Sequence, residues 1–368
     1  MKISDIDIHV CKQESSMNDQ NMRGGQKSEL EFIVIQIHTD EGITGTSMGY
    51  AGSGAQMAAH TAAANVKPWL VGKDPTLREA LWEEHRVQDR WWGHSPIFTY
   101  GPFDIALWDI LAKRAGLPLH ELLGGYQRKI PTYASSLVLD SPEAYAEEAL
   151  EVKDAGLQAY KLHPPGKVEF DIEAYRACRE AVGDDYRLMA DPVAAYTYEQ
   201  ALRIGRVLEE LEYYWYEEPL WDTDFYNLKK LTDKLDIPVC GTEVLKGSHF
   251  GTAQCIQQHI IDIVRTDVSW KGGITPVMKT AHLAESFGIQ CEIHTAIYHP
   301  LELVNLHCAC AVPNCEYFEI LWPRTTFDFG LQVPINIDNE GYAHLPDGPG
   351  MGIEMDWHFI KESTVEIL

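Results

Sequence analysis

The sequence predicts an α/β protein whose main part is a closed barrel of parallel strands, preceded by a smaller α+β region. Two observations support this prediction. From residue 130 to about residue 320, short apolar strands alternate with helical patterns, as they do where helices join parallel strands. Polar side chains also gather at the carboxyl ends of these strands, the face on which such barrels carry their sites. An open, doubly wound sheet is the alternative architecture.

The first 128 residues have a different pattern. Residues 3–10 alternate apolar and polar side chains, as a half-buried strand does, and a second apolar run at residues 32–38 ends in a hairpin-type turn at residues 40–42. Over residues 75–123 the apolar spacing becomes helical, and Gly124-Gly125 is a stop signal. We therefore expect an antiparallel sheet followed by helices.

Helix and strand signals then alternate. Ser141 is a suitable N-cap, Pro142 fits the first helical position, and Glu143 brings negative charge to the positive end of the helix dipole. We expect this helix to run to Gly156. Together with the strand at residue 130, eight strands are expected, and the other seven end at or near His163, Asp191, Glu217, Glu243, Asp267, His294 and Ile320.

Composition restricts the class of protein. A chain of 368 residues with 45% apolar content can bury a large core. Its 8 cysteines form no CxxC pair, the N-terminus has no apolar signal segment, and no apolar run reaches the about 20 residues of a membrane span. We expect a reduced, cytoplasmic protein. The formal charge of −25 argues against nucleic acid and anionic membranes as partners; we expect a homo-oligomer that binds a small carboxylate.

Three acidic residues at strand ends predict a metal site. Asp191, Glu217 and Glu243 follow one another at equal intervals of 26 residues, so a regular strand-and-helix repeat brings them to one rim. Unpaired like charges there would raise one another's pKa, so the three carboxylates require a hard divalent cation with oxygen ligands. Mg²⁺ is the predicted ion.

Candidate bases lie on both sides of this predicted metal. Lys161 and His163 end one strand and His294 ends another, several places away around the barrel, so they can approach a central substrate from opposite faces. A proton next to a carboxylate is very weakly acidic, and its removal requires a cation and hydrogen-bond donors at the carboxylate oxygens. The pattern therefore indicates metal-assisted proton transfer at carbon.

Several short motifs occur in a characteristic order along the chain. They are Asp191, Glu217-Glu218-Pro219, Gly241-Thr242-Glu243, Asp267 followed by Lys271-Gly272-Gly273, and His294, with Ala106-Leu107-Trp108-Asp109-Ile110, Leu122-Leu123-Gly124-Gly125 and Pro346-Asp347-Gly348-Pro349-Gly350 outside the barrel. In this order they resemble the enolase superfamily, mandelate racemase subgroup. The resemblance implies a (β/α)7β TIM-like barrel at residues 129–322. It also implies an α+β capping domain, formed by residues 1–128 and by the C-terminal segment 323–368, which returns to it.

The same resemblance implies a role for each candidate residue. Asp191, Glu217 and Glu243 would hold Mg²⁺ over an enediolate intermediate, and His294 would act as a base oriented by Asp267. Glu319 would donate a hydrogen bond to the substrate carboxylate. The sequence departs from the family at Lys161-Leu162-His163, where relatives have Lys-x-Lys; the shorter His163 argues against two-base racemisation. Pro192-Val193 replaces residues that are polar in many relatives.

Two loops are expected, by the same resemblance, to close over the barrel and select the substrate. One is the polar stretch at residues 15–27, in which Arg23 and Lys27 suggest a polyhydroxy acid or a second carboxylate; the other is the Gly-rich stretch at residues 49–54, which contains Tyr50.

The predicted reaction is dehydration of an acid sugar to a 2-keto-3-deoxy acid, with either His294 or the Lys161/His163 side as base. Racemisation, epimerisation or cycloisomerisation of a related acid are alternatives within the class. A metal-stabilised binding barrel without turnover is the alternative from another class. The chain has neither the His-x-His of zinc hydrolase barrels at its first barrel strand nor a Gly-x-Gly-x-x-Gly turn, which disfavours zinc hydrolases and dinucleotide enzymes.

Overall fold

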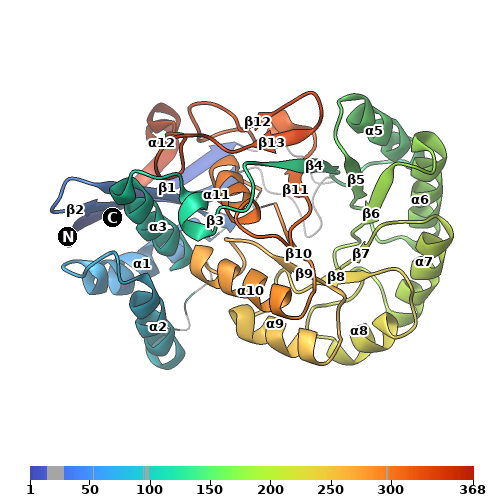
Figure 1. Ribbon diagram of the computed structural model, residues 1–368, viewed down its shortest axis with the longest axis horizontal. Helices are drawn as coiled ribbons and strands as arrows, with labels where there is room; N and C mark the ends of the chain where they lie inside the picture. Colours follow the sequence, from blue (N-terminus) through green and yellow to red (C-terminus); the bar gives the residue numbers. More distant parts are fainter. Residues whose placement is uncertain (15–28, 53, 94, 96–98, 296) are drawn as a thin grey trace.

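The computed structural model consists of a barrel with a smaller sheet and its helices packed beside it (Figure 1). In the described part of the chain, strands β4 to β10 form a parallel sheet in sequence order, β11 pairs with β4, and one helix lies between each strand and the next. The structure describes residues 1–14, 29–52, 54–93, 95, 99–295 and 297–368.

The barrel closes because its last strand, β11, pairs with its first, β4, and also contacts β10 on its other side. Phe318 of β11 lies opposite Thr132 of β4 in a parallel ladder, which excludes the open sheet and confirms the predicted barrel. The strands are β4 (Lys129–Ser135), β5 (Ala159–Leu162), β6 (Arg187–Ala190), β7 (Tyr216–Glu217), β8 (Val239–Gly241), β9 (Ile263–Thr266), β10 (Cys291–Ile293) and β11 (Phe318–Leu321). The helices between them are α5 (Pro142–Asp154), α6 (Val168–Val182), α7 (Tyr198–Glu210), α8 (Phe225–Thr232), α9 (Ser248–Gln257), α10 (Ile274–Ser286) and α11 (His299–Ala309).

Local sequence signals explain several of these helices. Ser141 accepts a hydrogen bond from the backbone of Ala144, as expected of an N-cap, and α5 ends two residues before Gly156. Thr197 and Gln200 form a reciprocal capping box at the start of α7. Inside the barrel, buried aromatic rings such as those of Tyr133 and Trp215 fill the amino-terminal layer, so functional groups collect at the opposite, carboxyl end.

The first third of the chain forms an antiparallel sheet covered by helices. The helical pattern over residues 75–123 is divided, because Gly116 adopts φ 68°, a left-handed conformation that ends α3. The elements are β1 (Ile3–Glu14), β2 (Glu29–Thr39), β3 (Thr44–Gly52), α1 (Ala55–Leu70), α2 (Arg78–Gln88), the π-helix η2 (Asp89–Gly93), α3 (Gly101–Ala115) and α4 (Leu119–Leu123).

The C-terminal segment contacts the barrel and then returns to the first sheet. Strand β13 pairs with β4, Tyr342 lying opposite Pro131, and β14 pairs with β1, Ile367 lying opposite His9. This is the predicted capping arrangement; the boundaries at residues 128 and 322 stay predictions. The elements are the 3₁₀-helix η3 (Arg324–Thr326), β12 (Asn336–Ile337), β13 (Tyr342–His344), α12 (Trp357–Ser363) and β14 (Thr364–Ile367).

A tight contact joins the capping helices to the barrel. Asp104 of α3 accepts hydrogen bonds from the backbone N (2.8 Å) and the Oγ1 (2.7 Å) of Thr275, at the start of α10. Gly273, with φ 114°, makes this approach possible, since a Cβ there would lie 2.5 Å from Asp104 Oδ2. The Gly272-Gly273 motif therefore has a packing role in fixing the cap beside the site.

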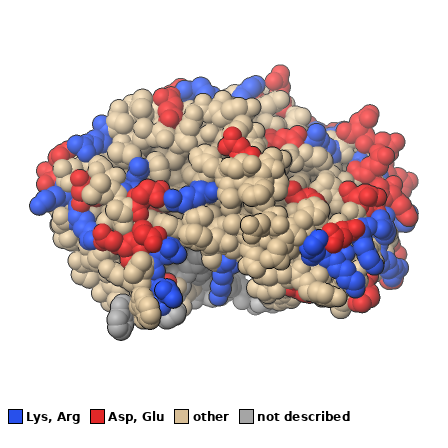
Figure 2. Space-filling model, turned by 60° about the horizontal axis from the view of Figure 1, so that its bottom comes forward, with Lys and Arg blue, Asp and Glu red and all other residues tan. Residues whose placement is uncertain are grey.

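Acidic and basic side chains are interspersed on the surface. In the view of Figure 2, basic side chains lie among acidic ones, and the middle of the face has few charged side chains. The 8 cysteines are all buried and unpaired. Within the described part of the chain, no helix has both the length and the apolar character needed to cross a membrane.

Candidate active site

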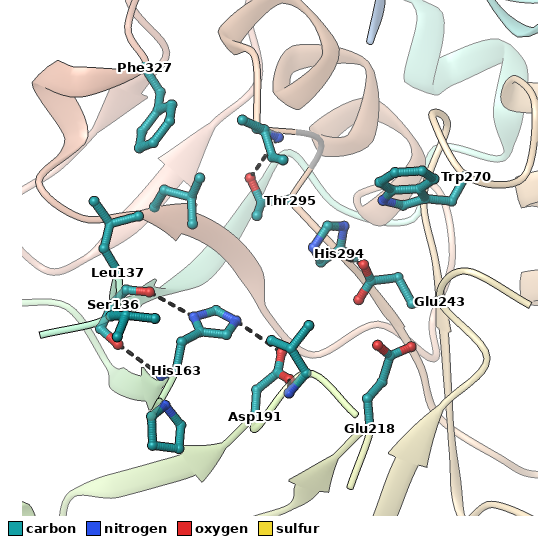
Figure 3. Close-up of a pocket in the computed structure, with 15 residues that line it drawn as sticks. Ser136, Leu137, His163, Asp191, Glu218, Glu243, Trp270, His294, Thr295 and Phe327 are labelled. Atoms are coloured by element: carbon teal, nitrogen blue, oxygen red, sulfur yellow. Dashed lines mark hydrogen bonds and ion pairs between the residues drawn. The ribbon is translucent and has the colours of Figure 1, made fainter. Parts of the chain in front are cut away.

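A cavity of about 210 Å³ opens at the carboxyl ends of the barrel strands (Figure 3). His163, Asp191, Glu243 and His294, all predicted site residues, line it. The other described lining residues are Ser136, Leu137, Val138, Pro164, Val193, Glu218, Trp270, Thr295, Ile297, Leu321 and Phe327.

Carboxylates form one side of the cavity. Asp191, Glu218 and Glu243 point into it and are almost fully buried. Burial, together with the nearby carboxylates Glu217 and Asp191, raises the pKa of Glu243 to about 7 against the opposing effect of His294. Burial and the neighbouring acids, Glu243 first among them, also raise the pKa of Glu218 well above its ordinary value. Negative charge on this side is therefore incompletely balanced by the protein.

Glu217 lies one layer deeper than predicted, in a fully buried ionic network. Its Oε1 accepts a hydrogen bond from Arg265 Nε at 2.7 Å, and its Oε2 accepts one from Trp215 Nε1 at 2.9 Å. Lys161 Nζ lies 3.0 Å from the same Oε2. The cavity is instead lined by the next residue, Glu218, whose backbone has φ 37°. The metal-ligand role of Glu217 stays a prediction.

Lys161 links the deep network to the cavity. Its ammonium lies 3.1 Å from Asp191 Oδ2 and 2.8 Å from Glu319 Oε1, in addition to its contact with Glu217. Burial lowers the pKa of this lysine, but Glu217 and Glu319 outweigh burial and raise the pKa well above its ordinary value. Lys161 is therefore a permanent positive charge beneath the carboxylates.

Glu319, predicted to contact the substrate, also belongs to the buried network. Its Oε2 accepts hydrogen bonds from Arg265 Nη2 at 2.5 Å and from the backbone N of Thr295 at 2.9 Å. Although burial opposes ionisation, Lys161 and Arg265 hold the pKa of this carboxyl well below its ordinary range. Glu319 thus supports Thr295, which lines the cavity, and its predicted contact with substrate stays a prediction.

His294 and Asp267 form the predicted pair. His294 Nδ1 lies 2.6 Å from Asp267 Oδ2, and Nε2 faces the cavity 3.3 Å from Glu243 Oε1. Because a carboxylate only accepts hydrogen bonds, Nδ1 carries a proton and Nε2 is the nitrogen offered to the cavity. Burial lowers the pKa of His294, but Glu243 and Asp267 outweigh it and raise the pKa to about 9.

His163 is held differently. Its Nδ1 lies 2.7 Å from the carbonyl O of Ser136, and its Nε2 lies 3.0 Å from Asp191 Oδ2 (Figure 3). The hydroxyl of Ser136 also accepts a hydrogen bond from the backbone N of His163 at 2.8 Å. The carbonyl fixes the proton on Nδ1 and leaves Nε2 facing the cavity. Two imidazoles therefore present the same nitrogen to one space from different strands.

Comparisons with known proteins agree with this architecture. Residues 144–359 match the family model described as "Enolase C-terminal domain-like", and residues 5–124 match that of the "Mandelate racemase / muconate lactonizing enzyme, N-terminal domain". The chain belongs to the mandelate racemase/muconate lactonizing enzyme family of the enolase superfamily. The resemblance seen in the short motifs is thereby confirmed.

Three proteins that are similar to this family member have the names of enzymes. An arabinonate dehydratase of Saccharolobus solfataricus is 33% identical over 342 residues, which cover 90% of each chain. An N-succinyl-L-Arg/Lys racemase of Bacillus cereus is 29% identical over 93% of this chain and 92% of its own. The crystal structure of D-glucarate dehydratase from Agrobacterium tumefaciens complexed with magnesium is 33% identical, covers 100% of both chains and has a TM-score of 0.90.

Another acidic cluster in this family member is a hydrogen-bonded network. In the described part of the chain, His299, Glu302 and Asp328 bring ligand-type atoms within 4.8 Å of one another. However, His299 Nε2 accepts a hydrogen bond from the backbone N of Ile335 at 3.0 Å, so its proton is on Nδ1, which faces both carboxylates at 3.1 and 3.2 Å. A metal would need the lone pair that Nδ1 does not offer.

Some predicted residues cannot be placed, and some lining residues were not predicted. Arg23 and Lys27, as well as the side chain of Tyr50, lie outside what the structure describes. Ser136 acts on His163 through its carbonyl, for which a sequence has no signal. Arg265, by contrast, could have been found, because a charged residue two positions before Asp267 on a buried strand must face the barrel interior with it.

Proposed function

We propose that this enzyme removes the proton α to the carboxylate of an acid sugar and then eliminates the β-hydroxyl, giving a 2-keto-3-deoxy acid. The observation that carries this proposal is the pair of imidazole Nε2 atoms, of His163 and His294, that face one cavity with carboxylates beside them. One imidazole can take a proton while the other gives one to the departing hydroxyl.

The carboxylate side of the cavity suits Mg²⁺. Glu218 Oε1 is buried and accepts no hydrogen bond from the described residues, and the pKa of Glu243 is raised by burial and by neighbouring carboxylates. Such a set of hard oxygen atoms with uncompensated charge fits this ion. The family motifs assign Asp191, Glu217 and Glu243 as its ligands, and Glu218, which lines the cavity where Glu217 does not, is the alternative to Glu217. When bound, the ion supplies Lewis-acid stabilisation of the substrate carboxylate. The name of the Agrobacterium tumefaciens structure, which includes magnesium, supports this assignment.

The protein's own residues then divide the work. His294 is backed by the carboxylate of Asp267, which stabilises its imidazolium, and we assign it the base role. His163, whose Nδ1 is held by the carbonyl of Ser136, is the other imidazole at the cavity, and we assign it the role of acid toward the leaving hydroxyl. Lys161 keeps its positive charge beneath Asp191. This charge offsets the negative charge that develops on the substrate carboxylate.

A screen of aldonic and aldaric acids tests the proposal. The purified protein is incubated in D₂O with Mg²⁺ or with a chelator, α-proton exchange is followed by NMR, and a keto product is detected with a carbonyl reagent. Metal-dependent exchange with keto product is the expected result. No exchange with any acid sugar would overturn the proposal and favour a binding barrel without turnover.

The same screen addresses racemisation or epimerisation, the alternative reaction. The observation that favours it is also the two-sided presentation of imidazoles, since one base on each face of a carbon allows its inversion, and one relative is named a racemase. Exchange with inversion at the α-carbon and no keto product would establish this alternative.

Paired variants test the proposed ligands. Glu217→Gln and Glu218→Gln make the same chemical change at adjacent positions, one in the deep network and one on the cavity wall. We expect Mg²⁺ binding, measured by calorimetry, to be lost in Glu217→Gln and to persist within about tenfold in Glu218→Gln. The reverse result would replace Glu217 by Glu218 in the ligand set.

A further inference from the structure

The cavity has two unlike sides. Figure 3 shows Asp191, Glu218 and Glu243 on one side and the side chains of Leu137 and Phe327 on the other, with the two histidines between them. The acidic side is where a substrate carboxylate would meet the proposed ion. The far side therefore faces the part of the substrate remote from the reacting carbons.

Five apolar residues that line the cavity are Leu137, Val138, Ile297, Leu321 and Phe327, which we call the apolar wall. Of these, Leu137 and Phe327 lie across from the acidic side (Figure 3). Among the described residues that line the cavity, none is Lys or Arg; the groups able to carry positive charge there are His163 and His294, at the reacting centre. The described wall therefore offers no countercharge to a second carboxylate.

Contacts outside the cavity hold one part of the apolar wall in place. Asp328, next to Phe327, lies 3.2 Å from His299 Nδ1 and 3.3 Å from Arg324 Nε, and the ring of Phe329 packs on Tyr298 with centroids 5.4 Å apart. These contacts join the loop after β11 to the start of α11. The wall is thus a preformed surface, which contributes to selectivity without being ordered by the ligand.

Another residue of the apolar wall is also held in one conformation. Ile297 has φ 68°, which a β-branched residue rarely adopts. Its backbone N donates a hydrogen bond to Thr295 Oγ1 at 3.4 Å, and that hydroxyl in turn donates to Glu302 Oε1 at 2.8 Å. An unfavourable backbone conformation kept by buried partners points to a functional reason for the position of this apolar side chain.

We infer that the substrate is a monocarboxylic acid whose chain ends without a second charge, an aldonic rather than an aldaric acid, and that its far end lies against the apolar wall. The inference rests on the proposed function and refines its substrate class. A second carboxylate pressed on the wall would lose water and gain no partner there, and such burial of an unpaired charge is strongly unfavourable. A hydroxyl-bearing or methyl end has a much smaller cost.

The expectation from Arg23 and Lys27 is the opposite, since two cations over the cavity would favour a second carboxylate. The two views predict opposite substrate preferences. The test compares an aldonic acid with the aldaric acid of the same chain length and configuration, together with the aldonic acid that ends in a methyl group, by kcat/KM and by α-proton exchange with Mg²⁺.

We expect kcat/KM for the aldonic acid to exceed that for the aldaric acid by about tenfold or more, and the methyl-ended acid to have a KM about threefold lower than its parent. An aldaric acid that reacts equally well or better overturns the inference and leaves the proposed function intact. Absence of exchange with all three acids, and with the wider panel, counts against the proposed function instead.

Two variants of one wall residue sharpen the test. Leu137→Arg adds a cation to the wall, and Leu137→Gln adds polarity of similar size without charge. The aldaric-to-aldonic ratio of kcat/KM should rise about tenfold in Leu137→Arg and change by less than about twofold in Leu137→Gln. An unchanged ratio in a folded Leu137→Arg enzyme, checked by circular dichroism, contradicts the inference. If that variant does not fold, the wild-type comparison still decides.

Discussion

The two histidine sides of the cavity differ in what lies behind the imidazole. His294 Nδ1 faces the carboxylate of Asp267 at 2.6 Å, whereas His163 Nδ1 faces the carbonyl of Ser136 at 2.7 Å. Both partners fix the proton on Nδ1, but of these two partners only Asp267 is charged. Each Nε2 also lies near a carboxylate, Glu243 at 3.3 Å from His294 and Asp191 at 3.0 Å from His163. We propose that this difference behind the two imidazoles distinguishes the base, His294, from the acid, His163.

Among the changes that test this comparison, replacement of His294 should have the largest effect on activity. In His294→Asn the Nε2 at the cavity is lost and the Asp267 carboxylate keeps no imidazole to orient, so we expect kcat for α-proton exchange to fall about 10⁴-fold. NMR exchange rates in D₂O measure it. A variant of His307, a histidine buried away from the cavity with its Nε2 3.0 Å from the Met351 carbonyl, is the matched control for stability. A fall of less than about tenfold in exchange would contradict the base role.

Removal of the backing charge alone should have the next largest effect. Asp267→Asn keeps an oxygen that accepts from His294 Nδ1 but no charge, and we expect kcat to fall about 10³-fold with KM nearly unchanged. Steady-state kinetics on the substrate found in the screen provide the measurement. If the activity of Asp267→Asn stays within about tenfold of the wild type, the charge of Asp267 is not what distinguishes the His294 side from the His163 side.

The difference between the His163 side and the His294 side of the cavity could be predicted only in part from the sequence. The strand ends that carry His163, Asp191, Glu243 and His294 follow from the regular repeat, because parallel strands bring their carboxyl ends to one rim. The pairing of His294 with Asp267 follows from the same argument. This pairing requires only that Asp267 and His294, which directly follow the neighbouring strands β9 and β10, point into the barrel.

The rest depended on backbone detail that no pattern encodes. β7 consists of Tyr216 and Glu217 only, and the positive φ of Glu218 turns that side chain to the cavity while Glu217 stays in the buried network. The partner of His163 is a backbone carbonyl, which every residue has. Phe327 comes from the irregular segment after β11, where neither a period of 2 nor one of 3.6 applies.

A change at His163 should have a smaller and more selective effect. In His163→Gln the proposed proton donor is lost while the His294 side is intact, so α-proton exchange should continue within about threefold and formation of keto product should fall about 10²-fold. NMR and the carbonyl assay on the same samples separate the two steps. Equal loss of exchange and product would mean that His163 takes part in proton abstraction, as the lysine of the family's Lys-x-Lys motif is expected to do.

The smallest expected effect is the release of protons when Mg²⁺ binds. Burial and neighbouring carboxylates raise the pKa of Glu243 to about 7, while the net effect of burial, Glu243 and Asp267 raises that of His294 to about 9. These groups therefore keep protons near neutral pH, and Mg²⁺ held at Glu243, as proposed, would favour their loss. Affinity for Mg²⁺ should accordingly rise as pH increases through about 7.

Calorimetry in two buffers of different ionisation enthalpy measures the protons released. Near pH 7 we expect a fraction of a proton per Mg²⁺ in the wild type and in His163→Gln, and a larger fraction in His294→Asn, because loss of the imidazole removes a group that holds the pKa of Glu243 down. Equal release in both variants would show that the two sides titrate alike. The backing groups, Asp267 and the Ser136 carbonyl, would then orient the imidazoles without distinguishing them, and the assignment of base and acid would rest on kinetics alone.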